Sequence, residues 1–149
     1  MVSVGGRRRA PLQRHGSPIM LKRMAMVFGV ILLLVGVAGY IPALTPEGRL
    51  LGIFEVDSMH NLVHIVTGIV AVMMGAKSEH ASRVFFQTFG VVYGLVALLG
   101  LFSGDAPLLG MMAHNWADFW LHVGIAGFSL WVGFYYAPRH EHPHHAAHA

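Results

Sequence analysis

Four ionisable side chains fall inside two of the four long apolar stretches of the sequence, at the spacing of one helix face. His60 and His64 are four residues apart, and so are Asp118 and His122. Residues four apart lie one turn above each other on the same face of an α-helix. Three imidazoles and a carboxylate are ligands that Zn²⁺ and similar divalent ions accept. Two histidines from different helices, here His64 and His122, are also an arrangement that suits haem in a helical bundle.

Both faces continue with small and polar residues. Asn61 and Gly68 extend the first face, and Gly133 lies at the end of the second. Small residues let helix backbones approach closely, and buried polar groups then bond across the contact. We therefore expect the two faces to meet and to bring the four ionisable side chains together. The resulting polar cluster includes Asn61.

This cluster has two interpretations. A His–Asp hydrogen bond, with Asn61 bridging two helices, would hold a bundle together without any chemistry, and the cluster could also bind a partner subunit or a ligand. Ionisable groups inside a membrane are costly, however, and commonly mark a functional site. The alternative is a haem- or metal-binding redox protein that uses His60, His64, Asp118 and His122. No Ser-His-Asp triad, phosphate-binding loop or nucleotide fingerprint is present, so the sequence does not favour an enzyme.

The elements that position these residues are expected to be membrane-spanning helices. Hydrophobic residues make up 55% of the 149 and charged residues only 11%, against about a quarter charged in a typical soluble domain. Four apolar stretches, at about 24–41, 59–76, 84–102 and 116–137, are each long enough to cross a bilayer. The sequence thus predicts an all-α, four-helix transmembrane bundle whose main partner is the lipid bilayer.

The basic residues predict the orientation of this bundle. Six of the ten Lys and Arg residues precede the first stretch, and three more lie between the second and third stretches or after the fourth. Only Arg49 falls in the connections on the opposite side. The positive-inside rule therefore places both termini in the cytoplasm, in a bacterial inner membrane. The basicity is concentrated near one end of the chain, so it is not interpreted as a nucleic-acid surface.

The sequence also suggests an internal repeat. Phe28-Gly29-Val30 matches Phe89-Gly90-Val91 at an offset of 61, and His64 matches His122 at an offset of 58. Each unit is a pair of helices that returns the chain to the same side. We expect two parallel helical hairpins related by a pseudo-two-fold axis along the membrane normal.

Other segments have simpler interpretations. Residues 1–19 are basic and poor in apolar side chains, which predicts disorder before a membrane domain at 20–137. Residues 138–149 contain five histidines and form a predicted disordered tail that binds metal weakly, with or without a biological role. Gly90 and Gly94 form a small-x3-small pattern for helix packing within the bundle or across a homodimer. The apolar residues 50–54 are too few to span and are expected either to lie at the membrane interface or to cap the bundle.

The segment LGIFEVDSMHNLVH at residues 51–64, followed by Gly68, resembles the hallmark of a bacterial four-helix integral membrane family known as a domain of unknown function. Residues 89–93 (FGVVY) and the Asn115-x2-Asp118-x3-His122 segment resemble it as well. The resemblance covers about residues 20–137, and the architecture is more distantly similar to DoxX-like membrane proteins. It implies a multi-pass inner-membrane protein and supplies no activity.

Overall fold

Four long helices make up most of the structure. The computed structural model describes residues 18–136. Its long helices are α1 (Pro18–Ala38), α2 (Ser58–Lys77), α3 (Glu79–Ser103) and α4 (Trp116–Trp131), and α4 continues as a π-helical turn, η3 (Val132–Tyr136). All four of these helices are long and apolar enough to cross a membrane. The predicted all-α, four-helix transmembrane bundle is confirmed, while most of the predicted N-terminal segment and the His-rich tail lie outside the described residues.

The helix bounds differ from the predicted ones where polar residues continue a helix. α1 begins at Pro18 rather than near residue 24, because proline is favoured in the first turn and long basic side chains can reach past an apolar stretch. α3 begins at Glu79 rather than near residue 84. Its start is fixed by the Ser78 hydroxyl, which accepts a hydrogen bond from the Ala81 N–H at 3.0 Å.

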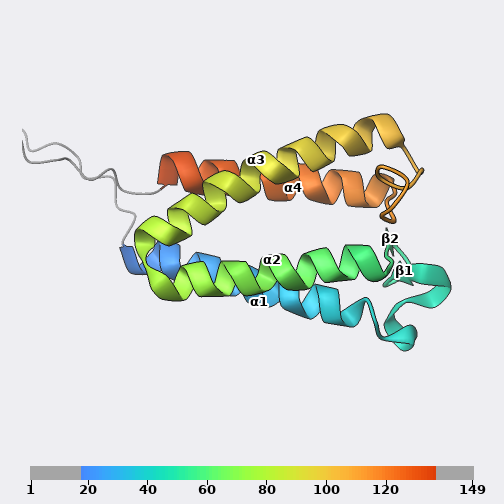
Figure 1. Ribbon diagram of the computed structural model, residues 1–149, viewed down its shortest axis with the longest axis horizontal. Coiled ribbons are helices and arrows are strands. Elements are labelled where there is room, and N and C mark those ends of the chain that lie inside the picture. Colours follow the sequence, from blue (N-terminus) through green and yellow to red (C-terminus); the bar gives the residue numbers. More distant parts are fainter. Residues whose placement is uncertain (1–17, 137–149) are drawn as a thin grey trace, which may run out of the picture.

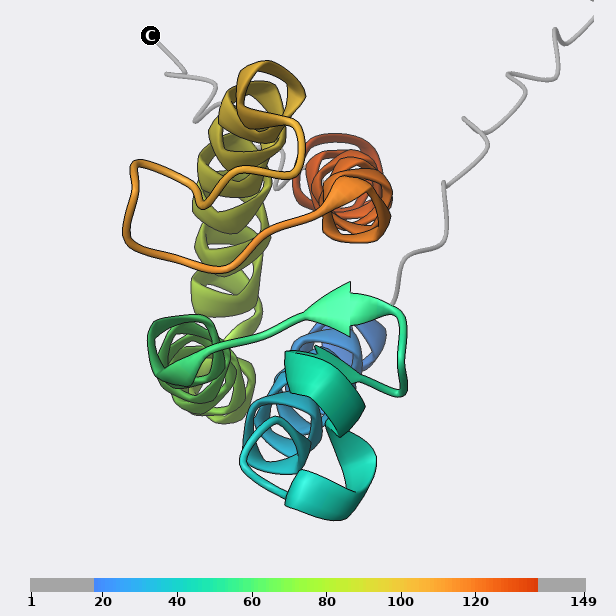
Figure 2. The ribbon, with the colours of Figure 1, turned by 90° about the vertical axis from the view of Figure 1, so that its right-hand side faces the viewer.

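The helices form two antiparallel hairpins, α1 with α2 and α3 with α4 (Figure 1). Figure 1 shows the α1–α2 and α3–α4 connections at one end of the molecule. The α2–α3 turn, the start of α1 and the end of α4 lie at the other end. Seen from the end with the two long connections, α1 and α2 form one pair and α3 and α4 the other (Figure 2). We call these the loop end and the turn end.

Glycines allow the close packing inside each hairpin. A Cβ added to Gly68 of α2 would lie 2.8 Å from the carbonyl oxygen of Gly29 in α1, and a Cβ added to Gly133 would lie 2.8 Å from the backbone nitrogen of Gln87 in α3. The predicted meeting of the α2 face with the α4 face is therefore wrong for the halves that carry Gly68 and Gly133. These halves pack within their own hairpins, because helices consecutive in sequence become neighbours and fill the space that glycine leaves.

Corresponding contacts recur in the two hairpins at the offsets found in the sequence. Gly29 packs against Val72 in the first hairpin, and Gly90 packs against Leu130 in the second. The first residues of these pairs are 61 apart and the second residues 58 apart. The internal repeat and the cytoplasmic placement of both termini stay predictions.

Aromatic rings join the two hairpins between their ends. The Phe28 ring of α1 lies 5.2 Å from the Phe89 ring and 5.8 Å from the Phe86 ring, both on α3, and 6.3 Å from the Phe128 ring of α4. Phe86 and Phe89 are buried. Edge-to-face and stacked pairs at these separations add to the energy of burial.

The α1–α2 connection folds back over the loop end. It contains two short 3-10 turns, η1 (Pro42–Leu44) and η2 (Pro46–Gly48), and a small antiparallel hairpin of β1 (Arg49–Leu50) and β2 (Phe54–Glu55). Gly52 takes a φ of 73° in the turn between the strands, where glycine carries no steric cost. Leu50 is buried, whereas Leu51 and Ile53 are exposed.

Candidate functional site

Three buried histidines come together where the two hairpins meet near the loop end. His60 and His64 belong to α2, and His122 belongs to α4. One ring nitrogen from each can be chosen so that all three lie within 4.8 Å of one another. We call these three residues the histidine cluster. It joins one hairpin to the other, so its geometry depends on how the hairpins pack.

The positions of the three histidines on α2 and α4 determine how their rings lie. His60 and His64 are one helical turn apart, and their rings stack with centroids 4.9 Å apart and planes at 19°. The His122 ring approaches from α4, with its centroid 6.0 Å from that of His60. His64 and His122 are each the seventh residue of their helix, which places them about 9 Å inside the helix starts at 1.5 Å per residue.

One imidazole has a fixed tautomer. His60 Nδ1 lies 3.0 Å from the carbonyl oxygen of Ala113. A carbonyl oxygen only accepts, so Nδ1 carries the proton and donates it in this bond. Nε2 then keeps its lone pair. A backbone carbonyl on the far nitrogen is the usual orienting partner of a metal-binding histidine.

The other two imidazoles retain unsatisfied nitrogens. Nδ1 of His64 and Nδ1 of His122 are buried and have no hydrogen-bond partner among residues 18–136. Leaving a buried polar group without a partner costs about 1–3 kcal/mol. Such groups in a native structure call for an explanation, and binding of an ion or ligand is one explanation.

Asp118 is buried near this region but serves another purpose, so its predicted grouping with the histidines is wrong. Its Oδ2 accepts hydrogen bonds from the backbone N–H groups of Asn115 at 3.1 Å and Glu55 at 3.2 Å. Asn115 and Asp118 form a capping box at the start of α4. A carboxylate in the first turn satisfies free N–H groups there, which directs Asp118 away from the cluster.

Asp57 is a matching residue that the sequence reasoning missed. It caps α2 by accepting the His60 N–H at 2.7 Å through Oδ1, and it accepts the Ala113 N–H at 2.7 Å through Oδ2. Asp57 and Asp118 thus each bond a backbone N–H of the other hairpin. The Asp-x2-His and Asn-x2-Asp spacings at the two helix starts were the available signals. We call Asp57 and Asp118 the capping carboxylates.

Asn61 also lies outside the histidine cluster, which corrects its predicted place there. Its side chain packs against Gly39, just beyond the end of α1, where a Cβ would collide with the amide. Asn61 therefore faces its own hairpin partner. Of the predicted packing glycines, Gly68, Gly90 and Gly133 make close helix contacts, whereas a Cβ on Gly94 would meet nothing within 4 Å.

Two further rings surround His122. The Tyr93 ring of α3 lies edge-on to it at 5.4 Å, and the His114 ring from the α3–α4 connection lies parallel to it at 6.3 Å. Burial lowers the pKa of His114 from its usual value, an effect opposed by the Gly100 backbone and by the charges of Asp105 and Glu55. His114 therefore adds an uncharged imidazole beside the cluster at neutral pH.

Comparison with known proteins identifies the family. No curated protein and no solved structure matches the chain. A family model described as Domain of unknown function (DUF4383) matches residues 22–135, which include all four helices almost in full. The match covers the histidine cluster and both capping carboxylates, and the chain belongs to this family.

Proposed function

We propose that the protein is a multi-pass membrane protein that binds one divalent transition-metal ion of the Zn²⁺ class at the histidine cluster. The observation that carries the proposal is the convergence of three buried imidazoles from two hairpins within 4.8 Å. Neutral imidazole is a preferred ligand of such ions. Three histidines leave a fourth position for water or another ligand.

The spacing of the nitrogens suits a single ion. A Zn–N bond is about 2.0–2.1 Å, so two nitrogens on one tetrahedral ion lie about 3.3–3.4 Å apart. The cluster nitrogens, all within 4.8 Å, need a contraction of up to about 1.5 Å, which rotations of the three side chains would have to provide. The His60–Ala113 bond and the unpartnered Nδ1 atoms of His64 and His122 support the same interpretation.

The geometry favours an ion over haem. A macrocycle between His64 and His122 needs an open slot beside both rings. His60 stacks on His64 at 4.9 Å and lies 6.0 Å from His122, so its ring occupies part of that space. A bound ion would instead use all three rings and would link α2 to α4.

Charge distribution supports a location in the outer half of a bacterial inner membrane. Lys22, Lys77 and Arg83 lie near the turn end, and Glu55, Asp57 and Asp105 lie at the loop end with the cluster. With the basic end in the cytoplasm, the ion would exchange with the extracytoplasmic side.

The test is the metal content of the purified protein. The His-rich tail would bind metal weakly and obscure the result. The starting variant is therefore the full chain with five histidines replaced by Gln, namely His140, His142, His144, His145 and His148. We expect it to retain about one equivalent of Zn²⁺ after dialysis, measured by elemental analysis. His64→Asn and His122→Asn should each lower the retained metal several-fold.

His80→Asn is the matched control, because His80 is an exposed histidine near the turn end. It should leave the metal content unchanged. Equal content in all these variants, or a folded starting variant that takes up no Zn²⁺, Cu²⁺ or Ni²⁺, would refute the metal site. In that case the buried imidazoles would serve only to pack the helices together.

A further inference from the structure

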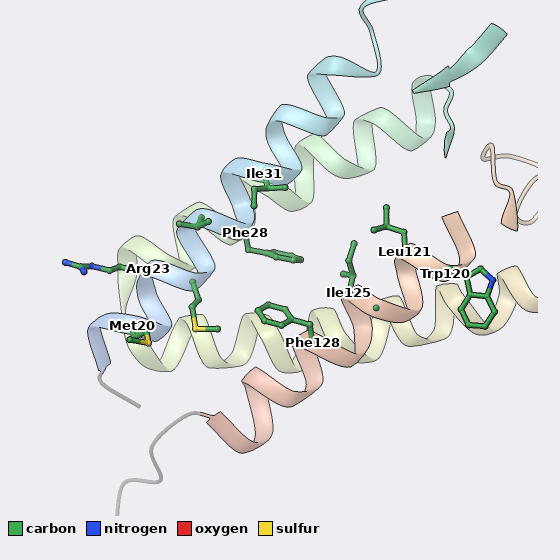
Figure 3. A pocket seen from close by; sticks show the side chains of 11 residues that line it. Met20, Arg23, Phe28, Ile31, Trp120, Leu121, Ile125 and Phe128 are labelled. Atoms are coloured by element: carbon green, nitrogen blue, oxygen red, sulfur yellow. The ribbon is translucent and has the colours of Figure 1, made fainter. Parts of the chain in front are cut away.

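An apolar groove runs along the membrane-facing surface between α1 and α4. It has a volume of about 600 Å³. Side chains of α1 from Met20 to Ile31 form one wall, and side chains of α4 from Trp120 to Phe128 form the other (Figure 3). Both helices are membrane-spanning, so the groove lies at the depth of the lipid tails.

The groove follows from the way the hairpins pack. Close glycine contacts hold α1 to α2 and α3 to α4, and α1 and α4 belong to different pairs. The Phe28 and Phe128 rings stack at 6.3 Å across the groove. Gly124 lines it on the α4 side, and a Cβ there would meet nothing within 4 Å. The missing side chain at Gly124 keeps this part of the groove open.

The α1 wall of the groove is about as long as one leaflet of a bilayer is thick, and the α4 wall continues beyond it to Trp120. Met20 and Ile31 are eleven residues apart on α1, which corresponds to about 16 Å of helix. The hydrocarbon core is about 30 Å thick, so half of it is about 15 Å. A groove of this length accommodates a single extended acyl chain from one leaflet.

The lining contains one charged residue, Arg23, at the turn end. Figure 3 shows its side chain extending away from the apolar walls. Neither of the two ion pairs found in residues 18–136 involves Arg23. A guanidinium at the membrane surface attracts anionic headgroups and pairs with phosphate oxygens.

We propose that this groove binds an anionic glycerophospholipid, with one acyl chain between α1 and α4 and the phosphate at Arg23. The groove provides apolar walls of the right length, and the single cation stands where the headgroup of such a lipid would be. Residues 1–17 are a poorer occupant, because this segment is rich in Arg and poor in large apolar side chains. This site is separate from the histidine cluster.

The experiment compares lipid retention in two glycine variants by native mass spectrometry. Full-length protein in detergent is mixed with equal amounts of phosphatidylglycerol and phosphatidylcholine. Gly124→Leu fills the groove and should remove most of the bound lipid. Gly127→Leu is the matched control, since Gly127 is on the same helix, is equally open, and does not line the groove. Equal retention by the two variants would overturn the proposal.

The headgroup is tested with Arg23→Gln. The wild-type chain should retain phosphatidylglycerol in preference to phosphatidylcholine, and the variant should lose about fivefold of that preference, the equivalent of about 1 kcal/mol for one basic residue near the surface. An unchanged ratio would overturn the role of Arg23. If Gly124→Leu acts by breaking a dimer, a second copy of the chain occupies the groove. If lipid uptake rises when residues 1–17 are deleted, that segment occupies it. Either result would overturn the proposal.

A second measurement does not depend on the folding of Gly124→Leu. The chain contains three tryptophans, of which Trp120 lines the groove and Trp131 does not. Phosphatidylglycerol with brominated acyl chains, added at low ratio in detergent, should quench a chain that keeps only Trp120 more strongly than a chain that keeps only Trp131. Equal quenching would contradict the site.

Discussion

The buried imidazoles of the histidine cluster differ in what each of them contacts. His60 is held by the Ala113 carbonyl, whereas Nδ1 of His64 and of His122 finds no partner among the described residues. Polar groups that serve only to hold helices together are expected to be hydrogen-bonded, because an unpaired polar group in a buried site is costly. Both ring nitrogens of His114 and the Ser129 hydroxyl, outside the cluster, are also without a hydrogen-bond partner among the described residues. The proposed ion site therefore depends on the convergence of the three rings, and metal analysis distinguishes it from a packing contact between the helices.

His114 predicts a pH dependence of stability. Its pKa is lowered in the folded protein by burial, against a usual value of 6.5. The unfolded chain then binds a proton more readily than the folded one, so this residue makes the protein less stable as the pH falls below about 6.5. Replacing it with a residue that does not titrate removes this contribution.

Melting temperatures in detergent between pH 7.5 and pH 5 measure the effect. The His114→Gln variant should lose stability less steeply than the wild-type chain as the pH falls. His80→Gln, at an exposed position, should keep the wild-type slope. A His114→Gln slope as steep as that of the wild type would show that His114 does not contribute.

At the scale of elements, the capping carboxylates connect helix starts to the opposite hairpin. Asp57 bonds Ala113 and Asp118 bonds Glu55, so each carboxylate both caps a helix and crosses the interface. Asn115 adds a third link by donating from Nδ2 to the Ile53 carbonyl at 2.8 Å. The loop end is therefore closed by polar bonds directly above the histidine cluster.

Asp57→Asn tests this arrangement. Both carboxylate oxygens accept 2.7 Å bonds from N–H groups, whereas an amide offers only one acceptor oxygen. One bond is lost and an N–H faces an NH₂ group, which should cost about 1–2 kcal/mol of unfolding free energy. Glu47→Gln removes the same charge from an exposed position in the same connection and should be close to neutral in detergent unfolding. Equal effects would mean that the bond to Ala113 is not formed.

The sequence was sufficient for the helices but only partly for the contacts between them. Long apolar stretches determine a membrane span by themselves, and His60 and His64 share a face because they are on one helix. Which helix faces which neighbour depends on packing. Asn61 and Gly68 packed against α1 rather than α4, since glycine backbones fit most closely against the neighbouring helix. Asp118 looked like a ligand by spacing, but its place in the first turn of α4 made it a cap.

For the whole molecule, the two hairpins contact each other through different chemistry at different depths. Polar bonds close the loop end, the histidine cluster lies beneath them, and the Phe28 ring packs against α3 further along. Between α1 and α4 the surfaces separate into the apolar groove. A metal ion at the cluster and a lipid in the groove would both contact the two hairpins, so both would stabilise their association.

These assignments depend on the orientation of the molecule in the membrane, which cysteine labelling measures. The chain contains no cysteine, so a single introduced cysteine gives an unambiguous signal. Ala106 is exposed in the α3–α4 connection, at the loop end, and His80 is exposed in the first turn of α3, at the turn end. Positive charges at the turn end predict that this end lies in the cytoplasm. In intact cells a membrane-impermeant maleimide should label the Ala106→Cys variant and not the His80→Cys variant, and both should be labelled after permeabilisation. The reverse pattern would put the histidine cluster in the cytoplasmic half and Arg23 beside the outer leaflet.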